Sequence, residues 1–310
     1  MKHVHLTIIL LTVSCIKAPE PKIHEYVITS SCKLPGYARD VYVKDGYAYV
    51  ANGQAGLVVV RLDSFKIISR LELRGYARTV YVMDSFAYVA TEAEGFVIVD
   101  VKDPYEPKLL GYDAWFTAYD LHTDNDTLVY IAASYWFIEE YVGDPNYPMY
   151  RRRCTTPGDA HGVYVVGGYA YVACEELGLT VIHVENRDSL ARVGFCDTPS
   201  NARDLFVSDT LAYVADGRGG LQIIDVSDPY NPYIVAGIEL EGYANRVYVK
   251  DDKAYVAAGR GGLKIVDVSD PAHPYLYGEC ITSYATSVFV DSLIYVTDRD
   301  MGLLIIQEVE

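Results

Sequence analysis

Four arginine side chains recur at one position of a repeated sequence pattern. Each follows a repeated alanine by one or two residues, and the four are Arg39, Arg78, Arg203 and Arg246. Guanidinium groups donate forked hydrogen bonds that match a carboxylate, so a ring of them indicates a site for a carboxylate or another anion. The same arginines could instead pair with acidic residues of neighbouring loops and lock the scaffold. Those loops carry Glu92, Glu94, Glu175, Glu176, Asp216, Asp298 and Asp300.

One histidine could support acid–base chemistry in the same region. His161 follows the repeated alanine of its own copy, and Glu175 and Glu176 come in the next loop. Such a group could serve a hydrolase or lyase acting on a saccharide or a lactone-like substrate. The sequence contains no nucleophile elbow, phosphate-binding loop or His-Glu-x-x-His motif. We therefore expect no cofactor and no metal site, and we rank an enzyme below a binding protein.

The third copy of the pattern departs most from the others and collects aromatic side chains. Trp115, Phe116 and Tyr119 precede its first strand. Trp136 and the phenylalanine after it replace the Gly-Leu pair that most other copies have at this position. An exposed aromatic group of this kind fits a sugar ring, a peptide or a partner protein. The alternative is that these bulky residues fill the space left by a shortened loop. In the binding interpretation, they lie on the same face as the arginines.

The pattern that carries these residues is a repeat of about 40 residues. Its first copy reads Ala-Arg-Asp-Val-Tyr-Val, then Tyr-Ala-Tyr-Val-Ala, then Gly-Leu-Val-Val-Val. Short blocks of Val, Ile, Leu and Tyr bounded by Gly, Asp and Pro are typical of β-strands. The hydrophobic residue after the Ala-x-x triplet recurs in seven copies, at Val41, Val80, Leu121, Val163, Leu205, Val247 and Val288.

Each copy predicts a four-stranded sheet, which the sixth copy shows in full. Its strands are expected at 244–250, 254–258, 263–268 and 275–281. The last copy ends after a third strand at 303–309, whereas the segment 25–32 resembles a fourth strand with no copy before it. Joining these two segments closes a ring and removes exposed sheet edges. We therefore predict an all-β fold, a seven-bladed β-propeller whose N-terminal strand completes the last blade.

The third strand and the turn after it resemble the LVIVD-repeat β-propeller family. The motif reads Leu-Gln-Ile-Ile-Asp-Val-Ser-Asp-Pro at 221–229 and Leu-Lys-Ile-Val-Asp-Val-Ser-Asp-Pro at 263–271, with weaker copies at 96–104 and 57–63. The resemblance extends over nearly the whole chain that follows the N-terminal segment. It implies a propeller and identifies no catalytic residue, because the shared motif is a strand and a turn.

The N-terminal segment predicts export. An apolar run at 6–13 is too short to span a bilayer and is typical of a signal peptide. Ser14 before Cys15 resembles the cleavage site of bacterial lipoproteins, with Thr12 where that site usually has Leu. The predicted division is a signal peptide at 1–14, a lipid-anchor tether at 15–23 and the propeller at 24–310. The alternative to an anchor at Cys15 is a periplasmic or secreted soluble protein.

Five cysteines follow Cys15, an odd number that cannot be fully paired within one chain. They are Cys32, Cys154, Cys174, Cys196 and Cys280. Most lie at the ends of fourth strands in different blades, where a disulfide would have to span too great a distance. Pairing of Cys174 with Cys154 or Cys196 is the alternative that the sequence leaves open.

The formal net charge of −16 argues against a nucleic-acid partner, because phosphate binding needs a basic surface. Aspartates concentrate in the turns that follow first and third strands, and both sets of turns lie on one face of a propeller. That face should be acidic, although the same aspartates also suit tight turns. The first set is Asp45, Asp84, Asp124, Asp126, Asp209, Asp251 and Asp252, and the second is Asp103, Asp144, Asp228 and Asp270.

These features together predict a monomeric, non-catalytic binding or scaffold protein of the cell envelope. It would recognise a protein, peptide or glycan through the face that carries the arginines and the aromatic residues, and it would contact the membrane only through its lipid. The hydrolase or lyase hypothesis and a purely structural role are the alternatives.

Overall fold

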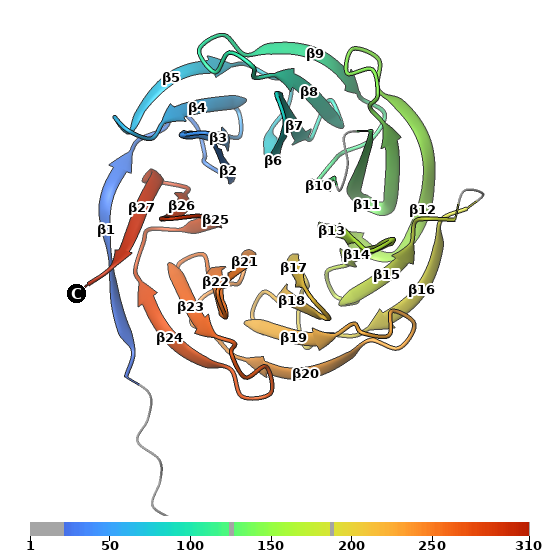
Figure 1. Cartoon of the computed structure of the whole chain (residues 1–310), viewed down its shortest axis with the longest axis vertical. Helices are drawn as coiled ribbons and strands as arrows, with labels where there is room; N and C mark the ends of the chain where they lie inside the picture. Colours follow the sequence, from blue (N-terminus) through green and yellow to red (C-terminus); the bar gives the residue numbers. More distant parts are fainter. Residues whose placement is uncertain (1–21, 124–126, 187–188, 310) are drawn as a thin grey trace, which may run out of the picture.

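The computed structural model describes residues 22–123, 127–186 and 189–309. Every regular element in these ranges is a β-strand, and the sheets are arranged radially around a central axis (Figure 1). No helix in the described ranges is long and apolar enough to cross a membrane. The signal peptide, most of the tether with Cys15, and the turn residues Asp124 and Asp126 lie outside the described residues.

Four sheets contain four antiparallel strands in chain order. The first consists of β2 (Asp40–Lys44), β3 (Tyr47–Ala51), β4 (Leu57–Arg61) and β5 (Lys66–Leu71). The second consists of β6 (Ala77–Met83), β7 (Phe86–Thr91), β8 (Phe96–Asp100) and β9 (Lys108–Asp113). The third consists of β13 (Gly162–Val166), β14 (Tyr169–Ala173), β15 (Leu179–His183) and β16 (Ala191–Cys196). The fourth consists of β17 (Asp204–Ser208), β18 (Leu211–Ala215), β19 (Leu221–Asp225) and β20 (Tyr233–Ile238).

An eight-stranded sheet brings the two ends of the chain together. Its order is β21 (Arg246–Lys250), β22 (Lys253–Ala257), β23 (Leu263–Asp267), β24 (Tyr275–Cys280), β1 (His24–Cys32), β27 (Gly302–Glu308), β26 (Ile294–Asp298) and β25 (Ala285–Val290). β1 pairs antiparallel with β27, whereas its parallel contact with β24 is limited to two residue pairs. The N-terminal strand therefore closes the ring, as the sequence predicts, and covers the edge of β27.

The remaining sheet consists of β10 (Asp120–His122), β11 (Leu128–Tyr141) and β12 (Met149–Ala160). Its long strand β11 reverses direction within itself. Ser134 has a left-handed φ of 52°, and the backbone N–H of Val142 donates to the carbonyl of Thr127 at 2.8 Å. β11 thus supplies both the second and the third strand of this sheet. The reversal falls where Trp136 and Phe137 replace the Gly-Leu step, which explains why this copy departs from the repeat.

Aspartate forms the tight turns between strands. Asp45 and Gly46 both have positive φ, as do Asp251 and Asp252, which is the geometry of two-residue hairpins that match the twist of the strands. In the Ser-Asp-Pro turn, the Asp228 side chain accepts the backbone N–H of Tyr230 at 3.0 Å. These contacts agree with a turn-forming role for the aspartates and also place their carboxylates on one face.

The hydrophobic core lies between neighbouring sheets. One cluster joins Tyr49 and Val59 of the first sheet to Val80 and Val97 of the next, and equivalent clusters recur around the ring. The repeated alanine fits this packing because its small side chain lets backbones of adjacent sheets approach: Ala77 exchanges two backbone hydrogen bonds with Gly53 of the preceding sheet. The innermost strands are thereby held around an axial channel.

Candidate functional site

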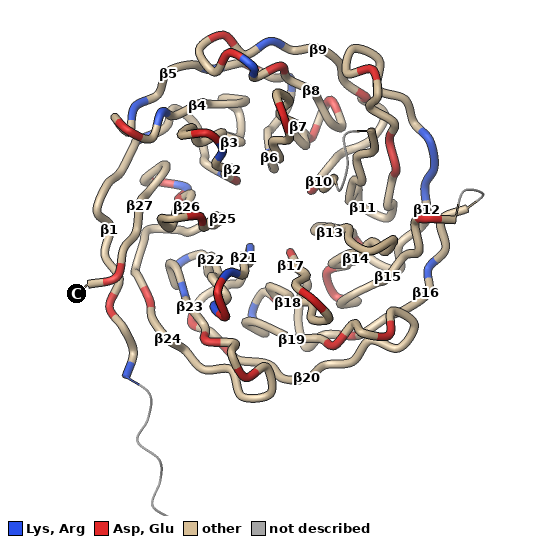
Figure 2. The backbone as a smooth tube through the Cα atoms, in the orientation of Figure 1, with Lys and Arg blue, Asp and Glu red and all other residues tan. Residues whose placement is uncertain are grey.

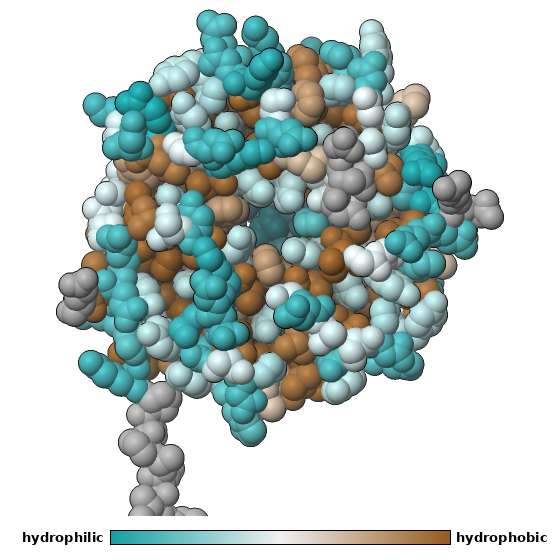
Figure 3. Space-filling view, in the orientation of Figure 1, coloured by the Kyte–Doolittle hydropathy of each residue, from teal (hydrophilic) through white to brown (hydrophobic). Residues whose placement is uncertain are grey.

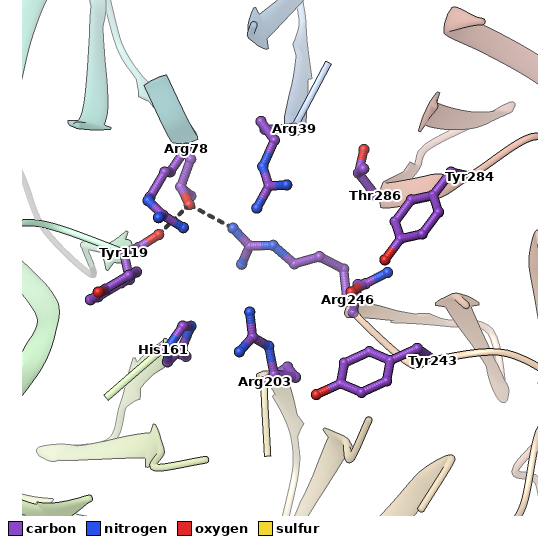
Figure 4. Close-up of a pocket in the computed structure, with 11 residues that line it drawn as sticks. Arg39, Arg78, Tyr119, His161, Arg203, Tyr243, Arg246, Tyr284 and Thr286 are labelled. Atoms are coloured by element: carbon purple, nitrogen blue, oxygen red, sulfur yellow. Dashed lines mark hydrogen bonds between the residues drawn. The ribbon is translucent and has the colours of Figure 1, made fainter. Parts of the chain in front are cut away.

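A cavity of about 360 Å³ occupies one end of the channel, and we call it the arginine cup. Its lining residues precede or begin the innermost strands, so each sheet contributes at the same level. Figure 4 shows the arginines and His161 converging on its centre from different sheets. The lining residues are Arg39, Arg78, Thr79, Tyr119, His161, Arg203, Tyr243, Asn245, Arg246, Tyr284 and Thr286.

Arg246 extends across the channel and forms the floor of the cup. Its guanidinium donates to Asp204 Oδ1 at 2.9 Å, to Asp120 Oδ1 at 3.1 Å and to Thr79 Oγ1 at 2.7 Å. Asp40 Oδ2 lies 3.7 Å away. These partners come from sheets around the ring, so the side chain ties opposite walls of the channel together. The predicted role of Arg246 as a ligand-binding arginine is thus combined with a structural one.

The three aspartates that hold Arg246 also connect neighbouring sheets. The Oδ2 atom of each carboxylate accepts a backbone N–H from an adjacent innermost strand at 2.9 Å: Val80 for Asp40, Val163 for Asp120 and Val247 for Asp204. Burial raises the pKa of Asp40, and it raises the pKa of Asp204 to about 6. Sequence reasoning did not select these three aspartates as site residues, although Asp opens the first strand in three copies.

His161 and Arg203 share one carboxylate in the wall of the cup. Arg203 contacts Glu175 Oε1, and His161 Nε2 lies 2.9 Å from the same oxygen. Burial, together with Arg203 and the other guanidinium groups, lowers the pKa of His161 to about 3. The imidazole is therefore neutral at pH 7 and a weak base. Glu176, the other predicted partner, is exposed and does not line the cup.

Arg78 is paired on one side only. Its Nη2 lies 2.5 Å from Glu92 Oε1, and its guanidinium carbon lies 4.6 Å from the centroid of the Tyr119 ring. Its Nε is buried and has no acceptor in the described part of the chain. A buried donor without a partner costs about 1–3 kcal/mol, so Arg78 has an unmet requirement that a ligand oxygen would satisfy.

Arg39 is the cup arginine without an acidic partner in the described ranges. It lies 5.9 Å from the Tyr76 ring centroid and forms no ion pair there, whereas the three other arginines all do. Burial and the neighbouring guanidinium groups lower its pKa. Three of the other acidic residues of the loops hold backbone instead: Glu94, Asp216 and Asp298 accept N–H groups of Arg74, Ser200 and Tyr284. Asp300 pairs with Arg299.

The predicted aromatic residues of the third copy separate into two places. Tyr119 lines the cup, but Trp115, Phe116 and Trp136 do not. Instead, Arg153 of β12 lies against both tryptophans, 5.6 Å from the Trp115 ring centroid and 4.0 Å from that of Trp136. Trp115 is 45% exposed, whereas Trp136 and Phe116 pack against the core. We call Trp115, Trp136 and Arg153 the rim cluster, and none of the three lines the cup.

Asp159, His161 and Glu175 could together face a metal ion, since one ligand atom of each lies within 4.8 Å of the others. Asp159 Oδ1 is buried and has no hydrogen-bond partner in the described residues. However, Arg203 already forms an ion pair with Glu175. The guanidinium groups that lower the pKa of His161 would also repel a cation. These surroundings favour an anion over a metal at this wall of the cup.

A second cavity of about 260 Å³ lies beyond Arg246 and the three aspartates, and we call it the aromatic chamber. Its wall is formed by the aligned hydrophobic residue of each innermost strand and by the residues beside it in the sequence. Sequence reasoning did not identify this cavity. The signal was present, because an aromatic residue or histidine follows the aligned hydrophobic residue in every copy.

The pairing of Cys174 with Cys154 or Cys196 is not formed. Cys32, Cys154, Cys174, Cys196 and Cys280 are all free thiols. Cys174 is buried among the hydrophobic residues between two sheets, where its thiol lies 3.6 Å from the carbonyl of Val172. Burial raises its pKa to about 11, which leaves it unreactive at neutral pH.

Known structures share this fold at low sequence identity. The crystal structure of RRP9 WD40 repeats matches with a TM-score of 0.75 and 9% identity, covering 94% of this chain and 100% of that chain. The structure of U3-55K gives 0.73 and 9%, covering 89% and 96%. The computationally designed Ika8 protein gives 0.61 and 11%, covering 91% and 99%. Such identities establish similarity of fold alone.

Sequence comparison is more specific. No curated protein matches the chain. The model of the LVIVD repeat matches five segments that together make up more than half of it, at 35–61, 74–112, 157–198, 199–237 and 241–282. The unmatched interval between 112 and 157 contains β10 and β11, where the repeat is most altered. The chain belongs to the LVIVD repeat family.

Proposed function

We propose that this protein is a binding or scaffold module whose arginine cup receives a carboxylate from a protein, peptide or glycan. Arg39 carries the proposal, because its guanidinium points into the cup (Figure 4) and has no acidic partner among the described residues. Guanidinium groups removed from water are normally paired with an anion. A partner carboxylate would supply the missing anion.

The rest of the cup supports the same ligand. Arg78 offers its unpaired Nε, and the hydroxyls of Tyr243 and Tyr284 lie in the lining. A volume of about 360 Å³ is near the lower limit for small-ligand pockets. The cup therefore accepts a carboxylate with a short attached group, such as a chain end or an acidic side chain, rather than a folded segment.

The hydrolase or lyase hypothesis has less support. The His161–Glu175 pair that it needs is present, but Arg203 competes for Glu175. With a pKa lowered to about 3, His161 would be a poor proton acceptor for this chemistry at neutral pH. A binding function requires none of these groups to transfer a proton.

We further propose that the ring is a seven-bladed propeller. In this count, the eight-stranded sheet contributes two blades, which the short parallel contact between β1 and β24 joins. Seven innermost strands, each carrying one member of a closed aromatic ring, support it.

The proposal places this module, as a monomer, in the cell envelope. It rests on the signal-like segment at 1–14 and on Cys15, which would carry a lipid. Mass spectrometry of the mature N-terminus tests this directly: a diacylated Cys15 is expected, and Cys15→Ser should release the protein from the membrane. An unmodified, soluble N-terminus would refute the anchor without affecting the cup.

Isothermal titration calorimetry with an N-acetylated dipeptide tests the binding function. The free-carboxylate form should bind, and its amide should bind at least about tenfold more weakly, since a charge-assisted pair is lost. Arg39→Gln should weaken carboxylate binding by roughly 10- to 100-fold. The matched control is Arg74→Gln, because Arg74 is 85% exposed and does not line the cup. Equal binding of acid and amide would refute the proposal.

A further inference from the structure

The aromatic chamber is lined by a closed ring of side chains from the innermost strands. Each member contacts the next with ring centroids 4.4–5.3 Å apart, and the last returns to the first. The members are Tyr42, Tyr81, His122, Tyr164, Phe206, Tyr248 and Phe289.

The size of this ring matches the range of cation–π attraction. Seven centroids with these spacings on a regular ring each lie about 6 Å from the axis, the distance within which a cation is attracted to an aromatic ring. Six of the seven neighbouring pairs have interplanar angles of 49–60°. Planes parallel to a sevenfold axis would turn by about 51° between neighbours, so the rings stand along the channel rather than across it.

The floor of the chamber carries more negative than positive groups. Asp40, Asp120 and Asp204 all line it, and Arg246 is the cation among its lining residues. His122 adds no charge at neutral pH, because burial lowers its pKa to about 4. Its Nδ1 accepts the backbone N–H of Val165 at 3.3 Å. The carboxylates therefore outnumber the cations of the chamber.

The opening of the chamber lies on the acidic face. The innermost strands run clockwise in chain order in Figure 1, whereas their residues run anticlockwise in Figure 4, so these views show opposite ends of the channel. Figure 3 shares the view of Figure 1 and shows a hollow at the centre of that face. The turns that follow the innermost strands carry Asp45, Asp84, Asp209, Asp251, Asp252 and Asp291.

Charge around this opening would attract cations. Figure 2 shows acidic segments beside β3 and β22, at the turns that surround the channel. Lysines also lie at the level of these turns, where Lys44 donates to the carbonyl of Asp84 and Lys250 to that of Asp291. The aspartates of the turns outnumber them. A surface of this sign raises the local concentration of cations at the opening.

We propose that the aromatic chamber binds a small organic cation of the quaternary ammonium class. The aromatic ring surrounds the site at a distance within the range of cation–π attraction, the aspartate floor supplies the opposing charge, and the acidic turns favour entry. A metal ion is a poor fit because the apolar wall cannot replace its water shell. An alkylammonium group carries its own apolar surface and loses little hydration. The site is separate from the arginine cup and does not depend on the function proposed for it.

Choline and its neutral carbon isostere, 3,3-dimethylbutan-1-ol, test the proposal by calorimetry on the mature chain. Choline should bind at least about tenfold more tightly than the isostere, because the two share shape and differ in charge. Tyr248→Leu and Phe206→Leu should each weaken choline binding by about tenfold while Tyr284→Leu, which alters the cup, leaves it unchanged. Circular dichroism of each variant confirms that it is folded.

Each outcome decides the proposal. Preference for choline that both chamber variants reduce would support a cation site. Equal binding of the isostere would overturn it in favour of an apolar pocket, and absence of choline binding at millimolar concentration would overturn it as well. If one chamber variant does not fold, the other and the isostere comparison still discriminate. Loss of choline binding in Tyr284→Leu alone would move the site to the cup and refute the assignment.

Discussion

The two ends of the channel are built from the same strands but present opposite chemistry. At the arginine cup, the contributed residues differ from sheet to sheet, with arginine, tyrosine, histidine and threonine side by side. At the aromatic chamber, each innermost strand contributes an aromatic residue or a histidine, and these side chains form one closed ring. The cup is therefore asymmetric and directional, whereas the chamber is close to symmetric.

This difference determines which kind of ligand each end of the channel can recognise. An asymmetric set of guanidinium donors fits a planar carboxylate, whose oxygens accept hydrogen bonds in fixed directions. A symmetric ring of aromatic side chains has no preferred direction and fits a rounded cation. Arg246 and its aspartates separate the two ends, so their ligands need not compete for the same space.

Removing Arg246 should have the largest effect, because both ends depend on it. Arg246→Ala leaves Asp40, Asp120 and Asp204 buried without their guanidinium partner, and we expect it to destabilise the fold by about 3–5 kcal/mol. Urea denaturation measures the change. Arg74→Ala, at an exposed position, is the control and should cost less than about 1 kcal/mol. Equal losses in the two variants would show that the buried ion cluster does not hold the channel together.

Acidification should change the stability of the fold in opposite directions through titratable groups at the two ends of the channel. His161 has a folded pKa of about 3, below its ordinary 6.5, so the unfolded chain takes up its proton first and stability falls as pH drops from 6.5 toward 3. Asp204 has a folded pKa of about 6, above its ordinary 3.8, so the folded chain takes up its proton first. Its contribution to stability therefore grows as pH drops from 6 to 3.8 and is lost again as pH rises through 6.

Single variants separate these two contributions. Between pH 7 and pH 4.5, His161→Gln should lose less stability than the original chain, and Asp204→Asn should lose more, each by about 1–2 kcal/mol. Urea midpoints at the two pH values provide the measurement. If both variants shift the acid dependence in the same direction, the contrast between the two ends is wrong.

Much of the scaffold could be predicted from the sequence because it follows from local periodicity. The strands expected at 254–258 and 263–268 agree with β22 and β23 to within one residue at each end. The pairing of β1 with β27 was predicted because each segment lacked the strands that the other supplies. The arginines were expected to gather because equivalent positions of a closed repeat lie at one level, and they do so in the cup.

The site was harder to predict because its details depend on contacts between sheets. The residues near Asp120 in the sequence do not indicate that its carboxylate accepts a hydrogen bond from the guanidinium of Arg246, which is far away in the sequence. The rim cluster was hard to predict for a similar reason. Trp115 precedes β10 and Trp136 lies within β11, and nothing near them in the sequence indicates that Arg153 of the outer strand β12 lies against both tryptophans. The aromatic ring was visible as a repeated residue type, yet repetition alone does not distinguish packing from a cavity wall.

Changes at the rim cluster should have the smallest effect and should not reach the channel. Arg153→Ala removes a guanidinium 4.0 Å from the Trp136 ring centroid, and the expected loss of stability is about 0.5–1 kcal/mol. Trp115→Ala should leave dipeptide binding at the cup unchanged within about twofold, because Trp115 does not line that cavity. Calorimetry beside Arg39→Gln gives the comparison. A Trp115 variant that weakens carboxylate binding as much as Arg39→Gln would reunite the rim cluster with the cup as one recognition surface.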